Sequence, residues 1–294
     1  RSMLMPDGSL IVNVARTGIA KLDWDGNLQW KLAGEYHHDV NYDDEGRVYA
    51  LFERTIDAGP EGAGVKIRDD AIVVVSPEGK VEDQLWFSEL FADYEPYQQA
   101  LEKAAKKKRR KPWDIFHGNS IEVLKAHPAG LWEDGDLLTS LRSRNTIAVI
   151  SRKKREVIWT WGPGHLKRQH SPSVTVDGKI VVFDNRHGPK KSRVLVVDPV
   201  KKEITFSYVG TKDRPFYSET RGISEGLDNG NLFVVSSNQG RLFELNPEGK
   251  IVWEYFHPES FKSKREPIRG SRIEGALYEA IKARLDAAGT ASQP

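Results

Sequence analysis

The chain contains no cysteine among its 294 residues. This absence excludes a disulfide framework and any metal site with cysteine ligands, but it leaves the compartment open because a large β-fold needs no disulfides. No apolar run reaches the roughly 18 residues that a membrane span requires, and no signal peptide is visible. The sequence begins at Arg1. We expect a segment upstream of it, and we predict export, with membrane association through that segment as a further expectation.

A strong excess of charge of either sign is also missing. The formal net charge is +2, and the basic residues are dispersed except for the run Lys106–Lys111. Nucleic-acid binding requires a basic surface, so we expect no nucleic-acid partner. We interpret the basic run as the solvated end of a helix, with a patch for a partner or for anionic lipid as the less favoured alternative.

Two sets of turn signals recur along the chain, and β-rich runs lie between them. The first set ends in glycine each time: Pro6–Gly8, Asp44–Gly46, Glu133–Gly135, Val176–Gly178 and Asp228–Gly230. The second set precedes the last β-rich run of each module: Asp23–Gly26, Ser76–Gly79, Ser151–Lys154, Asp198–Lys201 and Asn246–Gly249. This alternation predicts five modules of four strands joined by short hairpin turns.

Aromatic residues support a repeated unit. Trp159, Phe206 and Trp253 are spaced 47 and 47 residues apart, each in the last β-rich run of its module. A fixed period of this length is typical of repeat proteins, and four-stranded modules describe the blades of a β-propeller. The predicted fold is therefore an all-β propeller, in which these aromatic residues pack between blades and do not form a ligand cage.

The number of blades follows from the two ends of the repeat region. Residues 1–5 resemble the innermost strand of the first module, and residues 269–273 resemble the innermost strand of one more. We therefore prefer six blades, the last completed by residues upstream of Arg1, and keep five blades as the alternative. The propeller domain spans residues 1–273, and residues 274–294 form a C-terminal helix and tail.

One helical insertion interrupts the β-rich pattern. Residues 88–111 carry Leu90, Phe91, Tyr94 and Leu101 at helical spacing, with charged residues between them. We expect this insertion outside the ring, with its apolar face packed on a neighbour. It is the place where we predict a protein partner, if the molecule has one.

Histidine and arginine residues recur at matching places in the modules. His38 lies eight residues before Gly46, and His170 lies eight before Gly178. One position earlier, the matching residues are His37, Gln169 and Arg221. The string His-x-x-Ser-hydrophobic-x-Val, shared by residues 117–123 and 170–176, places His117 level with His170. Innermost strands line the central channel of a propeller, so we expect three histidines and an arginine to face one funnel.

These side chains suit chemistry on an anionic group. Imidazole acts as a base, a nucleophile or a metal ligand, and a guanidinium group binds a tetrahedral oxyanion through several donors. The alternative is that the polar side chains merely satisfy one another and water in the channel. Asp39 is the one carboxylate in their register, so we predict no metal site and no cofactor.

At these residues the chain resembles the bacterial aryl sulfotransferase family of β-propeller proteins, which move a sulfo group between phenols without a nucleotide donor. The matching segments are spread along nearly the whole chain: residues 37–39, 116–124, 145–150, 168–170, 182–185, 216–218 and 240–245. The resemblance implies a six-bladed, usually exported propeller whose channel histidines and arginine hold the sulfo group.

The resemblance matches His38, His117 and His170 to motif histidines and Asn185 to the Phe-Asp-Asn motif. Arg221 and His37, from the shared register, and Asn119, from the matching segment 116–124, complete the candidate site. The catalytic set is His38, His117, His170 and Arg221, and the substrate-binding set is His37, Asn119 and Asn185. In active members of the family one channel histidine is sulfated transiently, in the module after the Phe-Asp-Asn motif. Here that module has no histidine at residues 236–240.

Two functions therefore stay open. The first is transfer of a sulfo group between phenolic compounds, with a small phenolic or anionic ligand in the channel. The second is a catalytically silent propeller that binds an anion or serves as an interaction scaffold in a larger assembly. An open basic channel that contains all three histidines favours the first function, and a channel plugged by side chains favours the second.

Overall fold

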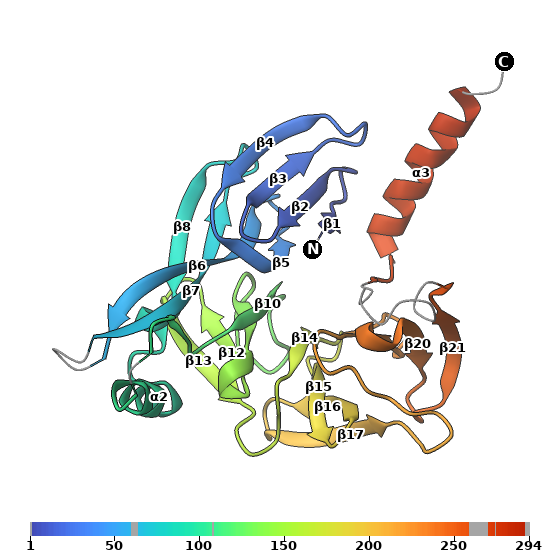
Figure 1. The fold of residues 1–294 in the computed structure, drawn as a ribbon. Coiled ribbons are helices and arrows are strands. Elements are labelled where there is room, and N and C mark those ends of the chain that lie inside the picture. Colours follow the sequence, from blue (N-terminus) through green and yellow to red (C-terminus); the bar gives the residue numbers. More distant parts are fainter. Residues whose placement is uncertain (1, 60–63, 108, 259–269, 274, 292–294) are drawn as a thin grey trace.

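The computed structural model describes residues 2–59, 64–107, 109–258, 270–273 and 275–291. Five antiparallel sheets stand radially about one axis, so that the innermost strand of each faces the centre (Figure 1). Within every sheet, the strand order from the centre outward follows the sequence. This arrangement confirms an all-β propeller with four-stranded blades.

The strands follow the repeat pattern of the sequence. Blade 1 consists of β1 (Ser2–Leu4), β2 (Leu10–Val14), β3 (Gly18–Leu22) and β4 (Leu28–Ala33). Blade 2 consists of β5 (Tyr36–Tyr42), β6 (Val48–Ala58), β7 (Val65–Val75) and β8 (Val81–Trp86), with the short β9 (Trp113–Asp114) parallel to β7. Blade 3 consists of β10 (Gly118–Val123), β11 (Leu137–Leu141), β12 (Thr146–Ser151) and β13 (Glu156–Trp161). Blade 4 consists of β14 (His170–Val174), β15 (Ile180–Gly188), β16 (Lys191–Asp198) and β17 (Glu203–Val209). Blade 5 consists of β18 (Ile223–Gly226), β19 (Leu232–Ser236), β20 (Arg241–Leu245) and β21 (Ile251–Phe256).

The first turn of each blade has one conformation throughout. Its glycine has φ between 79° and 84° in all five blades, which a residue with a side chain rarely adopts. In blade 2, the Gly46 amide donates to the Asp43 carbonyl at 3.0 Å, and the Gly178 amide of blade 4 donates to Thr175 at 2.9 Å. The repeated Asx-Gly signals are therefore the hairpins that separate the innermost strand from the second strand.

The described residues form five blades, and not the six that we expected. Residues 270–273 lie beside β1 and β18, but they form no strand. An innermost strand pairs with the second strand of its own blade, and no described residues supply a second strand for this segment. The remaining strands of the expected sixth blade were assigned to residues upstream of Arg1, and Arg269 lies outside the described residues.

Aromatic side chains on the outermost strands hold adjacent blades together. The Trp30 indole Nε1 of β4 donates to the Pro77 carbonyl of blade 2 at 2.9 Å. The Trp159 indole Nε1 of β13 donates to the Pro199 carbonyl of blade 4 at 3.0 Å. Each acceptor lies in the turn between the third and fourth strands of the next blade. The 47-residue spacing thus reflects one packing position repeated from blade to blade.

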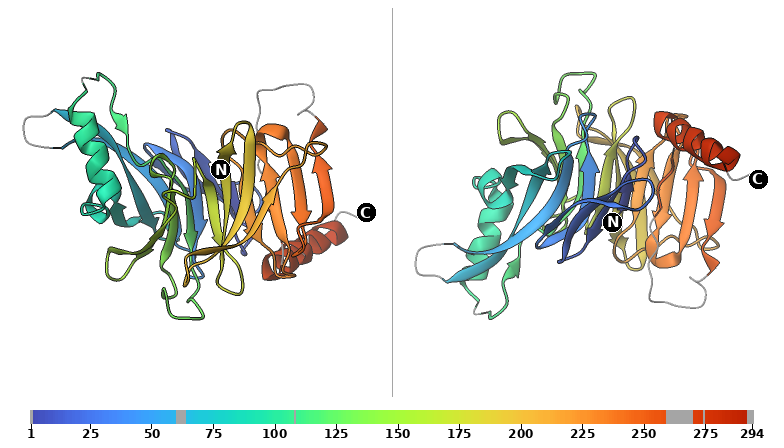
Figure 2. Two further views of the ribbon diagram at one scale, coloured as in Figure 1. Left: turned by 90° about the horizontal axis from the view of Figure 1, so that it is seen from below. Right: turned by 90° about the horizontal axis from the view of Figure 1, so that it is seen from above.

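The helical insertion lies on the outer side of blades 2 and 3, as Figures 1 and 2 show. It contains α1 (Phe87–Leu90) and α2 (Glu95–Ala105). Phe91 and Leu101 are buried in the core shared by the two blades, and the Tyr94 hydroxyl lies 2.9 Å from Thr146 Oγ1. The described residues of the basic run 106–111 are exposed, as expected for a solvated helix end.

The C-terminal helix α3 (Gly275–Ala291) bridges the first and last blades. The Arg272 guanidinium, just before α3, bonds Glu244 of blade 5 at 2.6 Å. Farther along, Arg284 of α3 lies over the Trp24 ring of blade 1, 5.5 Å from its centroid. Among the described residues, no helix is both long and apolar enough to cross a bilayer.

The aromatic contacts between blades generate a stability prediction. Trp159 is 7% exposed and bonded to the next blade, whereas Trp253, at the same position of the repeat, is 44% exposed. We expect Trp159→Ala to lower the free energy of unfolding by about 3–5 kcal/mol, as truncation of a buried aromatic residue does. Trp253→Ala should cost about 1 kcal/mol or less. Urea unfolding measures both, and equal losses would contradict the assigned packing.

Candidate functional site

Three innermost strands are irregular near the cavity. Strands β5, β10 and β14 shift register between His37 and Val40, Gly118 and Ile121, and His170 and Ser173. Positive φ occurs within these shifts at His38 (50°) and Ser171 (42°), and just before β10 and β18 at His117 (55°) and Arg221 (62°). Positive φ is uncommon for residues with a side chain and often marks functional sites. These irregularities direct the side chains into one space.

That space is a cavity of about 530 Å³ at one end of the ring axis. It is lined by four of the predicted catalytic residues, His38, His117, His170 and Arg221, and by His37. The other lining side chains include Asn13, Arg16, Glu53, Arg68, Asp70, Asp114, Arg142 and Thr220. The volume suits a small-molecule ligand. The structure therefore brings the four catalytic candidates around one cavity.

His117 lines the cavity from a different register position than the sequence pattern predicted. Pairing with the second strands places Val123 beside Leu137 and Val174 beside Ile180, each two residues after its turn glycine. Asn119, and not His117, is therefore level with His170, so the register inferred from the shared string is wrong by two residues. The His117 ring nevertheless lies 4.9 Å from the His38 ring, because the chain turns at positive φ just before β10.

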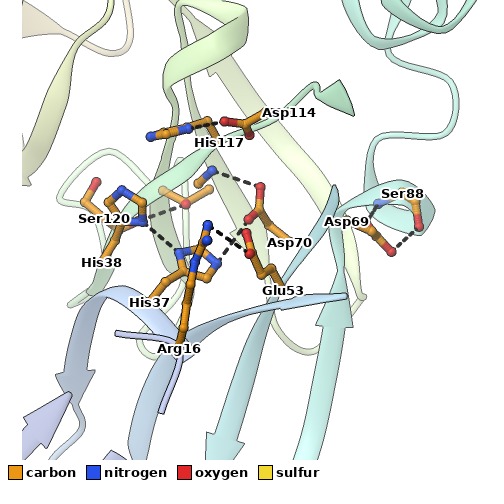
Figure 3. Close-up of polar contacts among 12 residues, drawn as sticks. Arg16, His37, His38, Glu53, Asp69, Asp70, Ser88, Asp114, His117 and Ser120 are labelled. Atoms are coloured by element: carbon orange, nitrogen blue, oxygen red, sulfur yellow. Dashed lines mark hydrogen bonds and ion pairs between the residues drawn. The ribbon is translucent and has the colours of Figure 1, made fainter. Parts of the chain in front are cut away.

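His117, the residue before β10, forms a close pair with Asp114 of β9 (Figure 3). Its Nδ1 lies 2.6 Å from Asp114 Oδ2. Burial raises the pKa of Asp114, but the hydrogen bond and charge of His117, with Arg68 and Arg142 nearby, leave it below its usual value. The carboxylate is therefore ionised at neutral pH and accepts the Nδ1 proton. This tautomer leaves the Nε2 lone pair of His117 as the nucleophilic or basic position.

His170 is bonded through both ring nitrogens. Nδ1 lies 2.6 Å from Asn185 Oδ1, and Nε2 accepts the backbone N–H of Arg221 at 3.2 Å. The amide nitrogen of Asn185 donates to the carbonyls of Ser218 and Arg221, so its oxygen is the acceptor for His170. These contacts hold the backbone of Arg221 at the rim of the cavity.

Asparagine side chains fix the same backbone position in three blades. The carbonyls of His37, Gln169 and Arg221, which share one register, accept bonds from Asn13 at 3.1 Å, Asn119 at 2.9 Å and Asn185. Asn119 and Asn185 are buried, and neither lines the cavity. Their contacts tie one blade to the chain that enters the next, from β10 for Asn119 and from β15 for Asn185. The predicted binding of substrate by these two residues remains a prediction.

Arginine residues make the cavity electropositive. Arg16, Arg68, Arg142 and Arg221 line it. Burial, followed by the charges of Arg168 and Arg186, lowers the pKa of Arg142. No described residue forms a hydrogen bond or ion pair with the Arg142 guanidinium. A guanidinium group remains charged in proteins, so an anion in the cavity would meet donors that the protein itself does not satisfy.

Blade 2 contributes a second polar group at the edge of the cavity. Nδ1 of His37 lies 2.8 Å from Nδ1 of His38, and Nε2 of His37 lies 3.1 Å from Asp70 Oδ1 (Figure 3). The Gly118 amide donates to the other Asp70 oxygen at 3.0 Å, and Glu53 pairs with Arg16 at 3.2 Å. His37 is therefore buried among polar partners and is linked through its ring to His38.

The module without a histidine has a structural role at residues 237–238. Ser237 Oγ accepts the Gly222 amide at 3.2 Å, and Asn238 Oδ1 accepts the Thr220 amide at 3.1 Å. These bonds hold the segment that carries Arg221. The absent histidine is thus replaced by polar side chains that position the arginine.

Several cavity residues were not identified from the sequence. Arg68 and Asp70 lie on β7, the third strand of blade 2, Asp114 lies on β9, and Arg142 lies in the connection between β11 and β12. A comparison of innermost strands cannot find them. Only Asp114 carried a local signal, because it lies three residues before His117 in the same segment.

Comparisons with solved structures agree with the propeller fold. A protein of unknown function from Bacteroides caccae is 12% identical with a TM-score of 0.57, and the match covers 86% of this chain and 79% of that one. The Dos1 propeller is 13% identical with a TM-score of 0.50, over 85% of this chain and 56% of that one. Virginiamycin B lyase from Staphylococcus aureus, solved with quinupristin, is 11% identical with a TM-score of 0.51. The match covers 87% of this chain and 69% of that one. At these identities the likeness concerns the fold alone.

No curated protein matches the sequence. The family model described as arylsulfotransferase (ASST) matches residues 1–257, which include all five blades and every residue of the cavity described above. With the propeller fold and the histidine and arginine residues around its axis, this match shows that the chain belongs to the arylsulfotransferase (ASST) family.

Proposed function

We propose that the protein transfers a sulfo group from an aryl sulfate to a second phenol, with His117 as the nucleophile. The observation that carries the proposal is the His117–Asp114 pair, because Asp114 holds Nδ1 and so orients Nε2 as the reactive nitrogen at a cavity lined by arginines. Activation of a nucleophile by a hydrogen-bonded partner is a general route to covalent catalysis.

In the first half-reaction, Nε2 of His117 attacks the sulfur atom of the aryl sulfate. A nitrogen–sulfur bond forms, the bond from sulfur to the aryl oxygen breaks, and the phenoxide leaves with the electron pair. The proton on Nδ1 stays in place, so the sulfated ring becomes cationic beside the Asp114 carboxylate. Asp114 thus stabilises the charge that develops on the ring, as the carboxylate of a catalytic triad does.

In the second half-reaction, the acceptor phenol loses its proton as its oxygen attacks sulfur. The nitrogen–sulfur bond breaks, and its electron pair returns to Nε2, which regenerates the neutral ring. We assign His38 as the base that takes this proton and returns it to the departing phenoxide of the next cycle. Its ring lies 4.9 Å from that of His117, within reach of the oxygen in transfer.

The arginines supply the binding of the sulfo oxygens. We assign Arg142 and Arg221 to this role, with Arg68 next to them, because the three groups line the same cavity as His117. The oxygens carry negative charge throughout transfer, and fixed donors in a cavity stabilise it more strongly than water does. His170 and Asn185 act through Arg221 as positioning residues, and His37 acts through His38.

Two further assignments concern features outside the cavity. The family resemblance supports export of the protein. The exposed basic residues that follow α2 on the outer side of the ring support a protein partner at residues 88–111. Neither assignment enters the proposed reaction.

The alternative is a propeller that binds an anion without transferring it. It is favoured by residues 237–238, which hold the Arg221 segment where the resemblance implies a reactive histidine. The two functions share the arginines and differ in their need for His117.

The kinetic prediction separates these functions. With 4-nitrophenyl sulfate as donor and phenol as acceptor, we expect His117→Ala to lower kcat/KM by at least about 10³-fold, because the nucleophile is lost. Asp114→Asn should lower it by about 10²-fold, because the developing ring charge loses its partner. His165→Ala, at an exposed histidine outside the cavity, is the matched control and should leave the rate unchanged. Nitrophenolate release by wild type equal to that of His117→Ala would refute the assigned nucleophile.

Anion binding gives a prediction that does not depend on turnover. Sulfate should raise the thermal unfolding midpoint of wild type, because a ligand bound by the folded state alone adds about 2.7 kcal/mol at a hundredfold excess over Kd. Arg142→Gln should lose most of this shift. Arg110→Gln, in the exposed basic run, should keep it and so measures the general salt effect. Equal shifts in all three proteins would exclude Arg142 from the anion site.

A further inference from the structure

We propose that His37, Glu53 and Asp70 form a binding site for a divalent metal ion on blade 2, at the edge of the cavity. Nε2 of His37 and one carboxylate oxygen from each acid lie within 4.8 Å of one another. The three residues come from three adjacent strands, β5, β6 and β7. The proposal goes beyond sulfo transfer and does not depend on it.

The sheet register places two like charges directly opposite each other. Glu53 of β6 pairs with Asp70 of β7 in the antiparallel ladder, so the two side chains leave the same face of the sheet. Like charges at directly opposed positions destabilise a sheet unless a cation lies between them. Asp70 is almost completely buried, with 3% of its side chain exposed, so solvent screens this repulsion poorly. The two carboxylates therefore favour the binding of a cation between them.

The geometry of His37 points to a shared ion. Its side chain is 6% exposed, and Nε2 lies 3.1 Å from Asp70 Oδ1 but forms no hydrogen bond to any described residue. The carboxylate oxygen thus lies at contact distance but off the direction in which a ring N–H would donate. Two neighbouring ligands of an octahedral ion with bonds of about 2.1 Å lie about 3 Å apart. Nε2 and Oδ1 have the separation expected of two ligands of one ion.

The donor set selects a class of metal. Carboxylates alone suit Mg²⁺ and Ca²⁺, whereas an imidazole ligand favours transition metals such as Mn²⁺ and Zn²⁺. Three protein ligands beside a cavity leave further coordination positions for water or a ligand, which is the arrangement of open metal sites.

The surrounding contacts resemble those that orient metal ligands. A ligating histidine commonly donates its other ring N–H to a second group, and Nδ1 of His37 lies 2.8 Å from Nδ1 of His38. The Gly118 amide holds the second oxygen of Asp70. With the metal bound at Nε2, the proton of His37 resides on Nδ1, and Nδ1 of His38 becomes the acceptor. The ion would therefore set the tautomer of His38, which faces the cavity.

Arg16 competes with the metal for Glu53. Its guanidinium lies 3.2 Å from the Glu53 carboxylate, and more than half of its side chain is exposed. Because an exposed arginine moves away at little cost, Glu53 can turn toward Asp70 when an ion arrives. Removal of Arg16 and removal of the Glu53 charge should therefore change metal affinity in opposite directions.

The test is calorimetric titration of MnCl₂ and ZnCl₂ into tag-free full-length protein that has been treated with EDTA. We expect one saturable site per chain for at least one of the two metals. Glu53→Gln should weaken binding at least about tenfold, and Arg16→Gln should strengthen it. Glu35→Gln, at an exposed acid just before β5, is the matched control and should bind as wild type does. His37→Gln should abolish binding.

Thermal unfolding of each apo variant shows whether it is folded, and the Glu53 and Arg16 variants keep the test valid if His37→Gln is unfolded. Electron paramagnetic resonance of Mn²⁺ provides a second readout of the bound ion without any turnover. Absence of a saturable site for both metals would overturn the proposal. So would a site whose affinity is the same in wild type, Glu53→Gln and Arg16→Gln, because such a site lies elsewhere. Neither result would affect the assignment of His117.

Discussion

Hydrogen bonds from asparagine side chains of one blade to the chain that enters the next blade determine where the cavity residues lie. Asn13, Asn119 and Asn185 each bind a backbone carbonyl at one repeated position, which His37, Gln169 and Arg221 occupy in the following blades. A buried amide that loses such a partner costs about 1–3 kcal/mol, so these bonds keep the strands in a fixed register. The bulges and positive φ angles beside them can persist only because the surrounding structure holds them.

The fixed frame allows opposite charges to be arranged within a small space. The negative groups, Asp70 and Asp114, each lie against a histidine, whereas Arg142 faces the cavity without a partner among the described residues. The hydrogen bond to Asp114 defines the tautomer of His117, and a guanidinium without a hydrogen-bond partner attracts an anionic ligand. The cavity therefore combines a nucleophile of fixed orientation with the donors that an oxyanion requires. Both features depend on the same contacts between blades.

Much of this fold could be predicted from the sequence, because turn glycines and outer-strand aromatic residues repeat at every blade. The histidines and Arg221 could be assigned to one cavity for the same reason. The exact level of His117 could not, because the shared string aligns His117 with His170, whereas pairing with the second strands aligns Asn119 with His170. Asp70 and Glu53 also escaped prediction, since they lie on the second and third strands, and this is why no metal site was expected. The count of blades differed because residues 270–273 found no strand to pair with among the described residues.

The proposed transfer requires a covalent bond between the sulfo group and one histidine, and a trapping experiment can detect this bond. The protein is mixed with an aryl sulfate in the absence of any acceptor, quenched at alkaline pH, digested and analysed by mass spectrometry. The account predicts one added sulfo group per chain on the peptide that contains His117, and its disappearance when phenol is added before quenching. A sulfo group on a different residue, or release of one equivalent of phenol with no added mass on the protein, would contradict it.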